Sequence, residues 1–196
     1  MKHRLTRRLS AGRIIIVALC AAALLKLFVL DMVLVRGESM RPTIEPGSVA
    51  VVLRCAYGLR FQPRLQATPR YIVRWSVPAP GDLVLVSPSP GGSLRAIKRV
   101  LEAGPAFMTA EAGVLHGRGG SVELGAAATR FAGTSFIPAG RLFIVGDNAA
   151  VSFDSRDYGS VPIEAIAGRV VVYHGWLAST VSRLLHFKET TDDVDR

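Results

Sequence analysis

The stretch GDLVLVSPSPGGSLRAIKRVL, residues 81–101, decides the fold of this chain. Two short runs rich in Val, Leu and Ile, residues 82–87 and 96–101, flank a segment of Ser, Pro and Gly. Apolar, β-branched runs bounded by Gly and Pro are typical of strands joined by turns. Runs of the same kind recur outward from this pair at residues 48–53, 71–73, 141–145 and 168–173. The pattern predicts an all-β body of short strands.

Other parts of the chain follow this pattern less clearly. Residues 113–133 are rich in Gly and Ala, so we expect a loosely packed insertion of hairpins or loops over about 103–136. One helical turn is predicted at 163–166 and a short helix at 177–185. The polar residues 187–196 are predicted to form a frayed tail.

An apolar segment lies near the N-terminus. Residues 14–30 contain a single charge, Lys26, whose long side chain can reach lipid headgroups. Apolar residues continue past Asp31 to Val35. Because a membrane-spanning helix needs about 20 such residues, we predict a transmembrane anchor over residues 14–35.

Basic residues precede the anchor and set its expected orientation. Residues 1–13 carry five basic side chains, Lys2, Arg4, Arg7, Arg8 and Arg13. Such a cluster predicts a cytoplasmic N-terminus, with residues 36–186 on the periplasmic or extracellular side of the cell membrane. The alternative is a signal peptide cleaved near Ala21 or Ala23. Apolar residues beyond Ala23 favour the uncleaved anchor.

Charge and cysteine content exclude other classes of protein. The net charge is +9, but the basic cluster in residues 1–13 supplies five of these charges, and the body has no concentrated basic helix for nucleic acid. Cys20 lies in the apolar segment, so we expect Cys20 and Cys55 to be free thiols. Neither has metal-ligand spacing, and the four histidines are scattered. We therefore predict no nucleic-acid partner, no metal and no cofactor.

Three segments contain residues suited to catalysis: 37–43 with Ser39, 96–100 with Lys98, and 146–159 with Ser152. Each alone is also typical of a turn, an edge strand or a loop. A serine hydroxyl is a weak nucleophile until a base takes its proton, and these segments contain no His/Asp pair. A lysine can serve as that base only if desolvation lowers its pKa from about 10.4.

In this order, the segments resemble the type I signal peptidase family of Ser–Lys peptidases. The resemblance covers residues 36–173 and implies a β body of short antiparallel strands behind one transmembrane helix. It also implies Ser39 as nucleophile and Lys98 as general base. The matching motifs are Gly37-x-Ser39-Met40-x-Pro42-Thr43, residues 81–86, Ile97-Lys98-Arg99-Val100, Gly146-Asp147-Asn148 and Ser152-x-Asp154-Ser155-Arg156-x-x-Gly159.

Supporting roles are expected for several residues of the last signature. By resemblance, Ser152 is expected to orient the Lys98 amine through a hydrogen bond. Asp154 and Arg156 are expected to form an ion pair that braces the loop, and Asp147 is expected to join this network.

The resemblance also predicts contacts with the substrate. The backbone N–H of Ser39 would form the oxyanion hole. Many relatives add a hydroxyl where this chain has Gly37, so a second donor must come from elsewhere. Met40 and Pro42 are the predicted substrate-binding residues.

Strand alternation distinguishes the two basic residues of the 96–101 run. Lys98 is expected to point inward and Arg99 to point to solvent. The apolar side chains expected to desolvate Lys98 are Ile97, Val100, and Phe143 or Val145.

The predicted function is removal of signal peptides from exported preproteins by cleavage after small residues. Expected partners are preprotein signal peptides, the lipid bilayer and the secretion machinery. Met40, Ile44 and Trp75 are expected to dip into the membrane interface. Two alternatives stay open: a specialised Ser–Lys peptidase for one exported or conjugation protein, and a non-catalytic, membrane-tethered β binding module.

Overall fold

The computed structural model describes residues 11–24, 29–61, 70–87, 95–131 and 133–174. Most of these residues form antiparallel sheets, which confirms the predicted β class. The largest sheet has seven strands in the order β1-β2-β13-β5-β6-β11-β12. Their bounds are Leu30–Leu34 (β1), Val49–Leu53 (β2), Leu83–Val86 (β5), Ala96–Ala103 (β6), Arg141–Val145 (β11), Val161–Pro162 (β12) and Ile166–His174 (β13).

The runs 82–87 and 96–101 form neighbouring strands, β5 and β6, in the middle of this sheet. Their side chains are buried on both faces. On β5, Val84 and Val86 pack into one core cluster, whereas Leu85 packs into a second cluster on the other side. Strands buried on both faces read as continuous apolar runs, which is why the sequence pattern is uninterrupted here.

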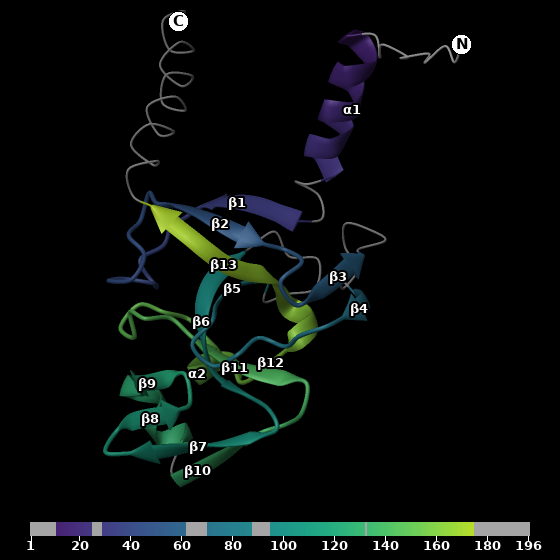
Figure 1. The fold of residues 1–196 in the computed structure, drawn as a ribbon. Coiled ribbons are helices and arrows are strands. Elements are labelled where there is room, and N and C mark those ends of the chain that lie inside the picture. The colour runs from purple at the N-terminus through teal and green to yellow at the C-terminus, as the bar shows by residue number, and fades with distance from the viewer. Residues whose placement is uncertain (1–10, 25–28, 62–69, 88–94, 132, 175–196) are drawn as a thin grey trace, which may run out of the picture.

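A second sheet of four strands, in the order β10-β7-β8-β9, lies at the end of the molecule opposite α1 (Figure 1). Its strands are Ala106–Glu111 (β7), Val114–Gly117 (β8), Gly120–Glu123 (β9) and Gly133–Ile137 (β10). This sheet occupies the predicted insertion and has a core of its own, in which Met108 and Leu115 are buried against Phe143 of β11.

The expectation of loose packing in this insertion is therefore wrong. Few large apolar residues occur there, but strand alternation places them on one face, so a small number suffices to form a core. Burial of each such side chain contributes about 1.5–3 kcal/mol.

Short elements complete the described fold. Gly58–Phe61 (β3) and Arg70–Arg74 (β4) form a two-stranded ribbon. A 3₁₀ turn covers Gly125–Arg130, a one-turn helix covers Ser155–Tyr158 (α2), and a 3₁₀ turn at Ile163–Ala165 confirms the predicted turn. The helix predicted at 177–185 and the tail at 187–196 lie outside the described residues.

The N-terminal segment differs from the prediction at its C-terminal end. Helix α1 covers Ala11–Leu24, but Leu30–Leu34 form strand β1, paired with β2. The predicted anchor through Val35 is therefore wrong at residues 30–35, because Asp31 and Val33 face inward while Met32 and Leu34 are exposed, a strand alternation. Among the described residues, no helix has both the length and the apolar character to span a membrane.

Candidate active site

Ser39 lies in the turn of residues 38–44 that follows β1, called the nucleophile turn here because Ser39 is the predicted nucleophile. The turn is closed by a hydrogen bond from the Ile44 N–H to the Met40 carbonyl, at 2.8 Å. Met40 and Ile44 are each only 1% exposed and pack into the core beneath the turn. The prediction that they contact the membrane interface is therefore wrong. Trp75, by contrast, is 57% exposed.

Lys98 lies on β6 and its side chain is 3% exposed, which confirms the predicted inward orientation. Its cross-strand partner is Val84 of β5, so the two side chains share a face. Val100 and Ile144 line the same apolar cluster as Val84. Of the predicted wall, only Val100 belongs to this cluster; Ile97, Phe143 and Val145 belong to two others.

The Lys98 amine donates a hydrogen bond to Ser152 Oγ at 2.6 Å, as the resemblance implied. Burial lowers the pKa of Lys98, and this effect outweighs the attraction of Asp154, which acts in the opposite direction. Arg156, the next largest influence, also lowers the pKa of Lys98. The surroundings thus favour the neutral amine, the form that can accept a proton.

Asp154 and Arg156 form the predicted ion pair, fully enclosed by protein. Arg156 Nη2 lies 2.8 Å from Asp154 Oδ2, and Arg156 Nε donates to Oδ1 at 2.9 Å. Burial by itself would raise the pKa of Asp154, but hydrogen bonds from Arg156, the Gly146 N–H and Ser152 hold that pKa below its ordinary value. Asp154 also caps helix α2, where its side chain accepts from the Arg156 N–H.

The hydrogen-bond chain sets the direction of each proton at Ser152. Ser152 Oγ lies 2.6 Å from Asp154 Oδ2, a carboxylate oxygen that can only accept. The single hydroxyl hydrogen of Ser152 therefore points to Asp154, and its oxygen accepts from Lys98. The lone pair of a neutral Lys98 amine is then left free for another donor.

Gly146 brings the nucleophile turn and Ser152 together. Val145, the last residue of β11, pairs with Arg99, so Gly146 stands one position beyond the strand, level with Lys98. A Cβ at Gly146 would lie 2.5 Å from the Ser39 carbonyl oxygen and 2.6 Å from Ser152 Cβ. Since real Cβ atoms do not approach this closely, only glycine permits the close packing. The glycine of the Gly-Asp-Asn motif could have indicated this close packing from the sequence, but no role was predicted for it.

We expect Gly146→Ala to lower kcat by at least tenfold and stability by about 1–3 kcal/mol, because its methyl group displaces Ser39 and Ser152. Cleavage kinetics and denaturant unfolding measure the two effects. Gly12→Ala is the matched control, since a Cβ at Gly12 meets no atom within 4 Å. Equal behaviour of the two variants would contradict this account of Gly146.

A second ion pair holds the nucleophile turn against β6. Arg99 donates to both carboxylate oxygens of Asp147, at 2.8 and 2.7 Å. Thr43 in the nucleophile turn donates a short hydrogen bond to Asp147 Oδ2. Two predictions are therefore wrong: Asp147 pairs with Arg99 and not with the Asp154 network, and Arg99 binds a carboxylate instead of pointing freely to solvent.

The two Ser39 groups expected to contact a substrate carbonyl, the hydroxyl and the backbone N–H, are not used in hydrogen bonds to the described residues. Within the described part of the chain, neither the Ser39 hydroxyl nor the Ser39 N–H donates a hydrogen bond. A Cβ at Gly37 would meet no atom within 4 Å among the described residues, so a side chain would fit at this position. Pro42 is exposed, while Met40 has little side-chain surface to offer.

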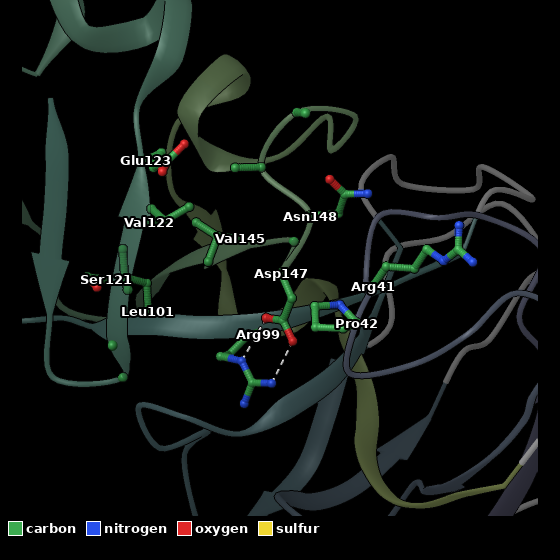
Figure 2. Close-up of a pocket in the computed structure, with 15 residues that line it drawn as sticks. Arg41, Pro42, Arg99, Leu101, Ser121, Val122, Glu123, Val145, Asp147 and Asn148 are labelled. Atoms are coloured by element: carbon green, nitrogen blue, oxygen red, sulfur yellow. Dashed lines mark hydrogen bonds and ion pairs between the residues drawn. The ribbon is translucent and has the colours of Figure 1, made fainter.

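A cleft of about 830 Å³ borders the nucleophile turn at Arg41 and Pro42 (Figure 2). Its walls come from the nucleophile turn, strand β9 and the loop of residues 146–150. Many of the lining residues are Gly, Ala, Ser or Val. Sequence reasoning missed this cleft because its walls come from segments far apart in the chain.

Comparison with known proteins identifies a matching family and several similar proteins. Residues 8–176 match the family described as signal peptidase, peptidase S26. The chain is 30% identical over 162 residues to signal peptidase I of Bacillus caldolyticus, covering 79% of this chain and 84% of that protein. Over 56 residues, it is 41% identical to a probable thylakoidal processing peptidase 2 of Arabidopsis thaliana, covering 29% of this chain and 15% of that protein.

Among solved structures, a signal peptidase I from Enterococcus faecalis is similar at 24% sequence identity. The match covers 48% of this chain and 97% of that chain, with a TM-score of 0.36.

Proposed function

The chain belongs to the signal peptidase family, peptidase S26, and from this premise we propose that Ser39 is its nucleophile and Lys98 its general base. The family makes it a serine endopeptidase of the signal peptidase I type, so preproteins are its substrates. The observation that supports the residue roles best is the buried Lys98 amine, held by Ser152 with its lone pair free.

Acylation would proceed at the scissile carbonyl of the preprotein. The neutral Lys98 amine takes the proton of Ser39 Oγ as that oxygen attacks the carbonyl carbon. The Ser39 N–H stabilises the oxyanion that forms. The Lys98 ammonium then gives its proton to the leaving amine, which is the new N-terminus of the mature protein, and the signal peptide remains as an ester on Ser39.

Deacylation would use the same residues. Lys98 takes a proton from a water that attacks the ester, and returns it to Ser39 Oγ as the signal peptide leaves. Throughout the cycle, Ser152 holds the amine in place, because its own hydroxyl group keeps donating to Asp154 and its oxygen accepts from Lys98. The exposed Pro42 is a proposed substrate contact. Cleavage after small side chains is proposed from the family resemblance.

The N-terminal residues would anchor the enzyme in the cell membrane. Helix α1 exposes Ile14, Ile15, Ile16, Val17 and Leu19. The basic residues before it favour a cytoplasmic N-terminus, which places the β body on the outer side, where exported preproteins emerge from the secretion machinery. The lipid bilayer is thus a proposed partner, and β1 is the first element of the enzyme body after the anchor.

Cleavage of a model preprotein by the full chain in detergent tests this proposal. Ser39→Ala is expected to abolish cleavage, whereas Ser76→Ala, at an exposed serine outside the site, is expected to retain it. Cleavage that persists in Ser39→Ala would contradict the assignment of the nucleophile. Wild-type protein that binds preproteins without cleaving them would support the alternative of a binding module, and cleavage of a single substrate only would support a specialised peptidase.

A further inference from the structure

The cleft beside the active site has a wall that the cleavage chemistry does not use. Strand β9 forms this wall, opposite the loop of residues 146–150 (Figure 2). The loop connects the cleft to the nucleophile, because the Asn148 N–H donates to the Ser39 carbonyl at 3.0 Å. A peptide with its scissile bond at Ser39 therefore has this cleft directly beside it.

Strand β9 is the last strand of its sheet, so β8 pairs with only one of its two backbone edges. Side chains alternate along a strand, yet all four residues Gly120–Glu123 line the cleft. Residues on both faces of a strand can line one cleft only through the strand's backbone edge. We therefore infer that the edge of β9 remote from β8 faces the cleft.

The hydrogen-bond pattern shows which backbone groups point there. The Glu123 carbonyl accepts from Arg156 Nη1 at 2.7 Å, so the Glu123 backbone points away from β8. Backbone direction alternates along an antiparallel pair, and Gly117 and Gly120 close the hairpin. The N–H and C=O of Ser121 therefore also point away from β8, toward the cleft.

We propose that the first residues of the mature protein bind in this cleft as an extended strand added to the free edge of β9. This inference rests on the proposed function. Strand addition supplies main-chain hydrogen bonds that tolerate many sequences, which suits an enzyme whose substrates differ beyond the cleavage site. The small lining residues leave room for a peptide, and the volume lies within the range of peptide and ligand pockets.

The position of β9 favours a peptide over a lipid headgroup. The second sheet lies at the end of the molecule opposite α1 (Figure 1). If α1 anchors the enzyme, the sheet that contains β9 lies at the end of the body remote from the bilayer, where a mature chain that has already crossed it can reach the cleft.

Charge adds a preference to this binding mode. Arg99 and Asp147, which both line the cleft, are paired with each other, and Arg41 is paired with Glu45 at 2.7 Å. Glu123, at the other end of the cleft in Figure 2, has no ion-pair partner among the described residues. Its carboxylate therefore favours a basic residue near the start of the mature protein and disfavours an acidic one.

An N-methyl scan of the mature segment tests the added strand. Peptides share one signal sequence and carry a single backbone N-methyl group at successive mature positions. We expect kcat/KM to fall about tenfold at the one mature position whose N–H bonds to the Ser121 carbonyl, because the Glu123 carbonyl already accepts from Arg156. The neighbouring positions are the matched controls. A uniform effect, or none, with the parent peptide still cleaved, overturns the inference and leaves the proposed function intact.

Charge exchange gives a second, independent test. We expect Glu123→Lys to reverse the preference between peptides that differ only by Lys or Glu early in the mature segment. Glu111→Lys, at an exposed position of β7 outside the cleft, is expected to keep the wild-type preference. Equal preferences in both variants would overturn the role of Glu123. A parent peptide that wild-type enzyme fails to cleave would instead contradict the proposed function.

A photo-crosslinking amino acid at position 121 of the full chain in lipid vesicles identifies the occupant. Crosslinks to the mature part of a preprotein support the proposal. Crosslinks only to lipid or to a second copy of the chain overturn it.

Discussion

Lys98→Met is expected to lower kcat by about 10⁴-fold or more, because it removes the base that activates Ser39 while keeping an apolar chain of similar length. In the wild type, activity should rise with pH as the buried amine loses its proton, and should do so below the pKa of an ordinary lysine, since burial lowers the pKa of Lys98. Rates measured across pH with a model preprotein check both points. Arg95→Met, at an exposed cation near the start of β6, is the matched control.

The same substitution should change how stability depends on pH. A lysine whose pKa is depressed in the folded state contributes stability above the unfolded value of 10.5, and loses it as pH falls through the folded pKa. In the window between these two values, the unfolded chain binds a proton that the folded enzyme does not, so wild-type stability increases with pH. Lys98→Met should flatten this slope in denaturant unfolding. Parallel slopes in the two proteins would contradict a depressed pKa.

Asp154→Ala is expected to have the largest effect on stability, about 3–5 kcal/mol, because it leaves the guanidinium of Arg156 buried without its partner. The Gly146 N–H and Ser152 also lose an acceptor. Ser152 is then free to donate to the Lys98 lone pair in competition with Ser39, so kcat should fall as well. Denaturant unfolding and cleavage kinetics measure the two losses.

A double-mutant cycle with Arg156→Ala checks the origin of this loss. Removal of both partners should cost clearly less than the sum of the two single changes, since no buried charge then remains unpaired. Glu45→Gln breaks the exposed Arg41–Glu45 pair and should cost less than about 1 kcal/mol. Additive single effects, or a similar loss in Glu45→Gln, would show that the Asp154–Arg156 pair is not a buried, coupled pair. Asp154→Asn, which keeps the shape of the side chain, serves if the alanine variant does not fold.

Much of the site could be predicted from the sequence because its parts are local. The inward direction of Lys98 follows from strand alternation, and the Asp154–Arg156 pair joins residues two positions apart on one turn. The Lys98–Ser152 hydrogen bond spans 54 positions, and it was predicted only through the resemblance to a family.

The errors concern contacts between distant segments. Asp147 was assigned to the nearby Asp154, but β11 carries it next to β6, where Arg99 forms a two-pronged hydrogen bond with it. Met40 and Ile44 were assigned to the membrane because they are apolar and near the anchor, but the turn directs them into the core. The strand Leu30–Leu34 was assigned to a helix because hydropathy does not distinguish a lipid-facing segment from a half-buried strand.

The sequence by itself determined the β class and the central pair of strands, since these depend on periodicity and on Gly and Pro turns, and its local motifs led, through the family resemblance, to the proposed serine and lysine. Only the tertiary structure decided which side chains desolvate Lys98, why residue 146 must be glycine, and that β9 shares a cleft with Pro42 and residues 146–150. The physical reason is that burial and close approach are properties of segments packed together in space, and the order of residues along one strand does not specify which other strand lies against it.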